Sequence, residues 1–318
     1  MTLATPITPT STFYNKAIAP RLRMAKYAGH RLWQSKLAVI GLAIVLLYLA
    51  VAIFAPLIAP QPARQRDPYE MQLDFKARKI APNAEHWFGT TDTGADIFYG
   101  VVWGARLSMI MGLSVTFVGA LIGVFLGGLA GYFGGVIDEF VMRITDVFLA
   151  MPLLIISMAV AVADPFNIAV RPDPIWKLVN IGVALSIVWW PSYTRIVRGQ
   201  VLALRENQYV EAARSVGAGS FRIIGRHILP NAISPVIVQA TLDIGTVILV
   251  SAALSFIGFG PSGSGFAEWG NLVSRGQEFM LQAWWGVTIP GLAIMGFALG
   301  FNLLGDGLRD LLDPRMRT

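Results

Sequence analysis

The side chains that most often carry out catalysis or bind metals are scarce in this chain. It has no cysteine, which excludes disulfides and thiolate nucleophiles. Its three histidines, His30, His86 and His227, lie far apart in sequence, which argues against a zinc site or a catalytic triad. The chain also lacks a Gly-x-x-x-x-Gly-Lys-Ser/Thr run, the signature of a nucleotide site. We therefore predict no catalytic residue, no metal site and no cofactor in this chain.

The polar loop 198–230 is the stretch whose residue types and spacing are most informative. No proline or glycine interrupts residues 201–216, as is typical of a helix, and Gly217 then predicts a stop. Ser220 is placed to cap a second short helix, which we expect to end at Pro230. The sequence thus predicts two short helices joined by a glycine turn.

Small and charged side chains in this loop suit contact with a partner. Ala212 and Ala213 have small side chains that would let a partner approach closely. Glu211 offers a charge beside them. In the second short helix, Phe221, Ile224 and Ile228 are expected to share one face. The composition alone fits a solvated amphipathic helix on a membrane surface equally well.

The elements that must position this loop are long apolar segments. The chain is 55% hydrophobic and only 14% charged, which is typical of a membrane protein. Several charge-poor runs approach or exceed the roughly 20 residues that cross a bilayer as a helix. The six candidate spans are 37–59, 107–131, 147–163, 178–197, 232–258 and 284–304. We predict an all-α integral membrane protein with six transmembrane helices.

Charge distribution predicts the orientation of these helices. With the N-terminus in the cytoplasm, 16 of the 25 Lys and Arg residues fall on cytoplasmic segments, so both termini are predicted to be cytoplasmic. The net charge of +6 therefore reflects membrane topology, and no basic face for nucleic acid is expected. The predicted organisation is a basic cytoplasmic segment at 1–36, a first transmembrane helix at 37–59, an extracytoplasmic loop at 60–106, a five-helix core at 107–304 that contains the loop 198–230, and a cytoplasmic tail at 305–318.

Two features inside the spans have competing interpretations. Glycines repeat every four residues along the second span, at Gly119, Gly123, Gly127 and Gly131, which favours a close helix–helix packing ridge over a substrate role. Asp243 lies near the middle of the fifth span, where a charge facing lipid is costly. It could line a translocation path, or it could bind a partner subunit.

Asp146 lies beside Arg143 at the start of the third span, and we expect these two residues to form a local ion pair.

Several motifs resemble those of a known family. The residues Glu211-Ala212-Ala213, Gly217 and Leu229-Pro230 match, in type and spacing, the EAA motif of permease subunits of binding-protein-dependent ABC importers. His86-Trp-Phe-Gly-Thr90 and Leu254-Ser-Phe-Ile-Gly258 resemble the C-type subunit of dipeptide and oligopeptide permeases. Thr91 and Ala95 depart from that pattern, where the family often has Asp and Arg.

The resemblance implies a mechanism and a set of partners. In that family the EAA loop forms coupling helices that sit in a cleft of a separate ATPase subunit, so Glu211, Ala212, Ala213, Gly217, Leu229 and Pro230 would form the ATPase-coupling element. Two such ATPase subunits would bind ATP and Mg²⁺. A second homologous permease subunit would complete a heterodimer, and an extracytoplasmic substrate-binding protein would deliver the cargo. The chain would then be a transport subunit, not an enzyme, in the inner membrane of a prokaryote.

The resemblance favours a peptide as the cargo, but related permeases also serve nickel, glutathione or an oligosaccharide. Two other classes of protein are alternatives to it. A stand-alone secondary transporter would need paired broken helices or a constellation of ionisable residues in the spans, and the sequence has one mid-span acid. A membrane enzyme would need clustered His, Cys or carboxylate residues near an interface.

Overall fold

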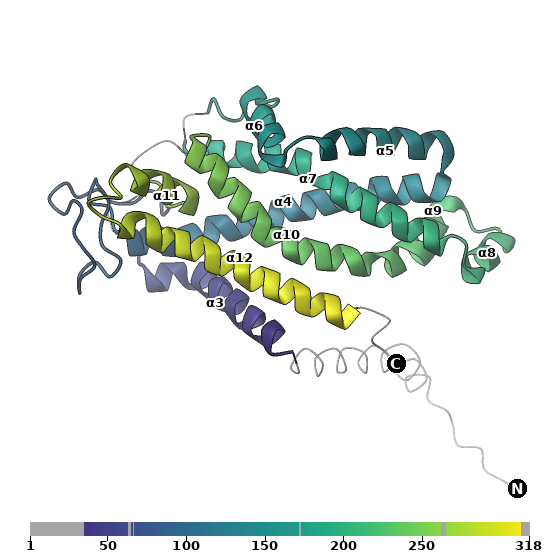
Figure 1. The fold of residues 1–318 in the computed structure, drawn as a ribbon, viewed down its shortest axis with the longest axis horizontal. Helices are drawn as coiled ribbons and strands as arrows, with labels where there is room; N and C mark the ends of the chain where they lie inside the picture. The colour runs from purple at the N-terminus through teal and green to yellow at the C-terminus, as the bar shows by residue number, and fades with distance from the viewer. Residues whose placement is uncertain (1–34, 63–64, 66, 172, 262–264, 313–318) are drawn as a thin grey trace, which may run out of the picture.

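The described part of the chain is a bundle of helices that run along the long axis of the molecule (Figure 1). This computed structural model describes residues 35–312 except 63–64, 66, 172 and 262–264, so nearly all of the predicted segment 1–36 and the end of the tail 305–318 lie outside it. Within these residues there are no strands, only the isolated bridges Glu70–Phe266 and Thr90–Asp96. The all-α prediction is therefore confirmed for the described chain.

Five helical segments are long and apolar enough to cross a membrane. They are α3 (Lys36–Ile58), α4 (Ile97–Phe133), α7 (Ile175–Leu204), the segment Ser220–Ile257 that ends in α10 (Leu229–Ile257), and α12 (Trp285–Leu312). A sixth crossing is available if the consecutive helices α5 (Gly135–Ala150) and α6 (Leu153–Ala163) are counted as one broken span. The structure therefore has five to six candidate spans.

The boundaries of the second span differ from the sequence prediction. Helix α4 begins at Ile97, inside the predicted loop 60–106, because Asp96 caps it by accepting a hydrogen bond from the Tyr99 amide. It ends at Phe133, where Gly134 adopts a φ of +66° that favours glycine. Helix α4 thus begins ten residues before the apolar run 107–131 from which the span was predicted.

The third span is broken where the sequence prediction had one helix, at 147–163. Helices α5 and α6 meet at an angle of 101° around Met151 and Pro152. Proline has no amide hydrogen and disfavours a helical conformation in the residue before it, which explains the break. The expected pair of Arg143 with Asp146 is wrong. Asp146 instead bonds Arg195 of α7 at 2.6 Å, while Arg143 approaches Glu139 at 3.9 Å.

The glycine repeat of α4 lies directly against α7. A Cβ added to Gly123 would lie 2.3 Å from Cβ of Tyr193, and one added to Gly127 would lie 2.5 Å from the carbonyl oxygen of Thr194. Gly119 and Gly131 also face α7, at Trp189 and Val201. Only glycine allows two helices to approach so closely, so the repeat determines the spacing of the α4–α7 pair.

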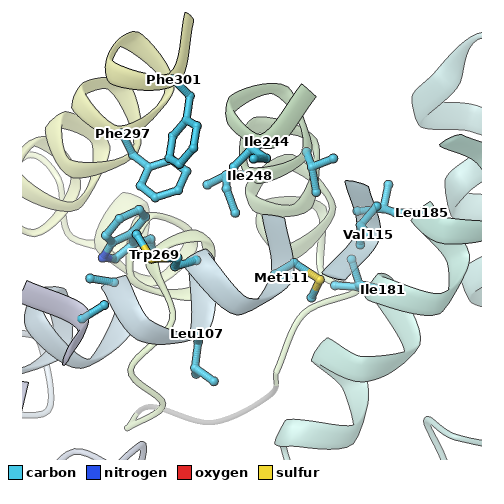
Figure 2. Close-up of a cluster of buried hydrophobic side chains, with 14 of the residues drawn as sticks. Leu107, Met111, Val115, Ile181, Leu185, Ile244, Ile248, Trp269, Phe297 and Phe301 are labelled. Atoms are coloured by element: carbon cyan, nitrogen blue, oxygen red, sulfur yellow. The ribbon is translucent and has the colours of Figure 1, made fainter. Parts of the chain in front are cut away.

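Side chains from four helices and a short connecting helix fill the centre of the bundle (Figure 2). The labelled members are Leu107, Met111 and Val115 on α4, Ile181 and Leu185 on α7, Ile244 and Ile248 on α10, and Trp269, Phe297 and Phe301. Trp269 is fully buried at the start of α11 (Trp269–Glu278), and its indole N–H donates to the Val101 carbonyl at 2.9 Å. Helix α11 is therefore fixed against α4.

The residues between α3 and α4 fold back onto the same end of the bundle as α11. The amide of Ala267 donates to the Tyr69 carbonyl at 2.7 Å, and the indole of Trp285 donates to the Thr90 carbonyl at 3.3 Å. His86 Nδ1 lies 2.7 Å from the Asp96 carboxylate that caps α4. These contacts make a folded cover over one end of the bundle, opposite the loop 198–230.

Candidate functional site

The loop that links α7 to α10 projects from the end of the bundle opposite α11 (Figure 1). Its helix α8 (Gln208–Ser215) follows the end of α7 after three residues. Val210 is fully buried and anchors α8, whereas Glu211 and Ala212 are exposed. The predicted helix over 201–216 is thus two helices, α7 and α8, with a bend between them. The exposed acid and its neighbouring alanine lie on the outward face of the second.

Gly217 forms the turn that ends α8. Its φ is +82°, in the left-handed region, and an added Cβ would meet no atom within 4 Å. The amide of Gly217 donates to the Arg214 carbonyl at 3.0 Å, and the amide of Ala218 donates to the Ala213 carbonyl at 3.1 Å. These two bonds are the Schellman pattern, which satisfies the last carbonyls of a helix. The glycine is required here by backbone conformation, since there is free space for a side chain.

The second half of the loop differs in detail from the sequence prediction. Ser220 is the first residue of α9 (Ser220–Ile223) and makes no side-chain cap. A π-helical turn, Ile224–Ile228, continues it into α10, so Pro230 lies in the first turn of α10 and does not end a helix. Ile224 and Ile228 are buried, but Phe221 is 73% exposed, so the three residues do not form one buried face.

The loop is tied to α4 at both ends. The Arg205 guanidinium donates to the Gly131 carbonyl at 3.2 Å, at the inner end of the glycine repeat. On the return, Leu229 packs over Gly128, whose added Cβ would lie 3.5 Å from Leu229 Cδ2. The loop therefore presents an exposed face, around Glu211, on an anchored base.

Asp243 lies among residues of its own chain. It is 7% exposed, and Gln239, one turn earlier on α10, donates to its Oδ1 at 2.9 Å. Tyr193 and Trp189 approach this carboxylate from α7. Among the described residues, Asp243 Oδ2 and the Tyr193 hydroxyl make no hydrogen bond of ordinary geometry, although the two groups face each other. The carboxylate therefore lies between α7 and α10 of its own chain, and its role in a translocation path stays a prediction.

Sequence reasoning found Asp243 but missed part of its surroundings. The spacing of Gln239 and Asp243, four residues apart on one helix, was a readable signal. Nothing in the sequence indicated Tyr193, which comes from a helix fifty residues away. Glu268 was also missed. It is 4% exposed and caps α11 by accepting bonds from the amides of Gly270 and Asn271 at 2.8 and 2.7 Å.

The described residues contain no group of three or more His, Cys, Asp or Glu side chains that could hold a metal ion. The features that the structure does bring together are apolar spans, a broken helix pair and an anchored polar loop at one end. They are the features of a multi-pass membrane protein. Comparison with known proteins then identifies its family.

Residues 123–318 match the model of the binding-protein-dependent transport system inner membrane component, and residues 24–81 match the N-terminal TM domain of oligopeptide transport permease C. The chain therefore belongs to the family of binding-protein-dependent permease subunits, in its oligopeptide permease C branch. The resemblance drawn from the EAA loop is confirmed. Membership also makes the chain a multi-pass protein of the inner membrane.

Relatives cover nearly the whole chain. It is 42% identical to the dipeptide transport system permease protein DppC of Alkalihalophilus pseudofirmus, covering 91% of this chain and 89% of the relative. It is 41% identical to the probable D,D-dipeptide transport system permease protein DdpC of Escherichia coli, covering 94% and 95%. It is 38% identical to the glutathione transport system permease protein GsiD of Escherichia coli, covering 91% of each.

A solved structure shares the fold. A chain from inward-facing conformations of the MetNI methionine ABC transporter matches with a TM-score of 0.53 at 20% identity, covering 68% of this chain and 97% of that chain. At this identity the likeness concerns the fold alone.

Proposed function

We propose that this chain is the C-type permease subunit of an ATP-driven importer that carries peptides across the inner membrane. The dipeptide permeases at 41–42% identity over most of the chain support peptides as the cargo. Glutathione is itself a small peptide, so the glutathione permease relative fits the same class of cargo. Nickel and oligosaccharides are the remaining alternatives from the family resemblance.

The observation that carries the mechanism is the geometry of the loop around Glu211. Its exposed face lies on α8, beyond the inner ends of α4 and α7, while Val210, Ile224 and Ile228 hold its base. In this proposal the face docks on a separate ATPase subunit, which binds ATP and Mg²⁺. Both termini lie on the cytoplasmic side with this loop, as the distribution of Lys and Arg supports. The folded cover at the other end then faces an external substrate-binding protein.

A second, homologous permease subunit completes the proposed heterodimer, and two ATPase subunits drive it. Asp243 has a structural role in this scheme, because its neighbours belong to its own chain. The glycines Gly119, Gly123, Gly127 and Gly131 hold α4 against α7, so that the loop is attached to two closely packed helices.

The test uses the complete importer reconstituted in liposomes with its loaded binding protein. Glu211→Lys and Gly217→Pro are expected to insert normally but to lose ATP hydrolysis stimulated by the loaded binding protein. Proline cannot adopt a φ of +82°, and it also removes the amide that bonds Arg214. Glu211→Asp keeps the charge of the side chain, and Gly217→Asn tolerates the left-handed conformation. Both control variants should keep coupled hydrolysis.

Coupled hydrolysis that survives both Glu211→Lys and Gly217→Pro would show that this loop is not the docking element. The cargo is tested separately, by loading the binding protein with a dipeptide, glutathione, Ni²⁺ or an oligosaccharide. Stimulation of ATP hydrolysis by the dipeptide is the expected result. Stimulation by Ni²⁺ or the sugar alone would refute peptide import.

A further inference from the structure

Helix α5 is only lightly buried in the bundle. Of its 16 residues, only Thr145 is buried, and its hydroxyl bonds the Val141 carbonyl of the same helix at 2.8 Å. Val136 and Phe140, by contrast, are 83% and 65% exposed. A helix of a bundle normally packs through a continuous apolar face. An apolar contact joins α5 to α7, between half-buried Phe148 and buried Trp190, whose ring centroids lie 5.5 Å apart. Polar contacts add to this light packing.

Two ion pairs connect α5 to α7. Arg198 binds Asp138 in a bidentate manner, with Nε 2.5 Å from Oδ1 and Nη2 2.7 Å from Oδ2, and both side chains are mostly buried, at 31% and 19% exposed. Arg195 binds Asp146 at 2.6 Å, with both side chains more than half exposed. A bidentate arginine–carboxylate pair fixes direction as well as distance. Asp138 and Arg198 thus form the stronger brace between the two helices.

The brace is close to the loop that the proposed function assigns to ATPase docking. Arg198 lies six residues before Leu204, where α7 ends, and α8 begins at Gln208. Arg205 binds the end of α4 within the same stretch. One continuous helix therefore connects the docking loop to the residue that holds α5.

Helices α5 and α6 are joined by a sharp break. The two helices meet at 101° around Pro152, and α6 is attached separately to α7, where Asn180 Nδ2 donates to the Ala161 carbonyl at 2.8 Å. A break of this kind can act as a hinge, since few residues absorb the change of angle. The broken span is therefore attached to α7 on both sides of a candidate hinge point.

We propose that Arg198 and Asp138 are positioning residues that pass movement of the docking loop to the broken span α5–α6. The proposal rests on the proposed function, because it requires an ATPase that moves α8. A chain of contacts does not by itself demonstrate coupling, so the test measures coupling directly.

The first measurement is the amount of peptide imported per ATP hydrolysed in the reconstituted importer. Arg198→Gln and Asp138→Asn should each lower this ratio by about 2- to 30-fold, the range seen for residues along a coupling route, while stimulated ATP hydrolysis remains. Arg143→Gln is the matched control, because the Arg143 side chain lies on α5, is 79% exposed and approaches Glu139 of the same helix at 3.9 Å. It should not change the ratio. The exchange Asp138→Arg with Arg198→Asp should recover part of the loss.

Failure of this proposal is distinct from failure of the proposed function. If Glu211→Lys abolishes stimulated hydrolysis but Arg198→Gln leaves the import ratio unchanged, the docking role of the loop is supported. The Asp138–Arg198 pair then has no coupling role. If Arg198→Gln and Asp138→Asn instead prevent the subunits from assembling, the pair belongs to folding and the proposal is also overturned.

A second measurement follows the movement itself. The chain has no cysteine, so spin labels can be placed at Val136→Cys on α5, Val216→Cys at the tip of the loop and Ile237→Cys on α10, with cysteine-free partner subunits. The 136–216 distance should stay constant between nucleotide states while the 136–237 distance changes. Adding Arg198→Gln should broaden the 136–216 distribution. A 136–216 distance that changes with nucleotide as much as 136–237, or that is unaffected by Arg198→Gln, would overturn the proposal.

Discussion

Substituting Gly123 by alanine should force α4 and α7 apart. The new Cβ would lie 2.3 Å from Cβ of Tyr193, 2.8 Å from the Trp190 carbonyl oxygen and 2.9 Å from the Thr194 amide nitrogen. Carbon atoms in contact prefer about 3.5–4.0 Å, so the helices must separate by more than about 1 Å at this point. Because the opposing atoms are backbone or Cβ atoms, no rotamer change relieves the clash.

The expected cost follows from a comparison with Gly128, on the same helix. A Cβ added there would meet only Leu229 Cδ2 at 3.5 Å and Ile224 Cγ2 at 3.8 Å, which is ordinary contact. Both substitutions gain about 1 kcal/mol of helix propensity, and this gain cancels between them. The remaining difference is the overpacking at Gly123, about 1–3 kcal/mol. Gly123→Ala should therefore be less stable than Gly128→Ala by about that amount.

Unfolding of the purified chain in mixed micelles with increasing SDS, followed by tryptophan fluorescence, measures the difference. The order of stability is also predicted within the repeat. Gly127→Ala should behave like Gly123→Ala, and Gly119→Ala, whose nearest atom is 3.1 Å away, should be milder than either. Equal unfolding midpoints for Gly123→Ala and Gly128→Ala would refute the close approach of α4 and α7.

Two further predictions concern buried acids. Asp243→Asn keeps the size of the side chain and its hydrogen bond from Gln239, so peptide uptake should be retained. Asp243→Ala leaves Gln239 unpaired and should lower the free energy of unfolding by about 1–3 kcal/mol in the same assay. Lost uptake in a stable Asp243→Asn variant would instead place the carboxylate in the transport path. Burial raises the pKa of the Glu268 carboxyl, so the folded state favours the protonated form and is penalised as pH rises above 4.5, the ordinary value. The melting temperature of the wild type should therefore fall with rising pH relative to Glu268→Gln, and parallel curves would contradict this.

Features that depend on local backbone chemistry could be predicted from the sequence. Gly217 was expected to end a helix, and it does so with a positive φ and a Schellman pattern. The four-residue spacing of the glycines on α4 correctly indicated one face. The residues that pack on that face could not be predicted, because Tyr193 and Val197 of α7 look like ordinary apolar positions of a span.

Features that depend on distant residues escaped prediction. Asp146 and Arg143 are three residues apart, which suggests a local pair, yet Arg195 is 49 residues away in sequence and binds the acid in the fold. The start of α4 could not be predicted from hydropathy either. Hydropathy locates the apolar core of a span, whereas the helix itself begins at a cap, Asp96, that lies well outside the core.

The close approach of α4 and α7 also bears on the proposed mechanism. Gly119 and Gly131 bound a contact of more than three helical turns, and within it the backbone of α7 lies directly over α4. Two helices that interlock over this length have no space to slide past each other, because each step would bring a backbone atom of α7 against α4. Movement of the docking loop therefore cannot be absorbed between them. We expect it to appear where packing is lighter, and α5, with one fully buried residue and a break at Pro152 beside it, meets this condition.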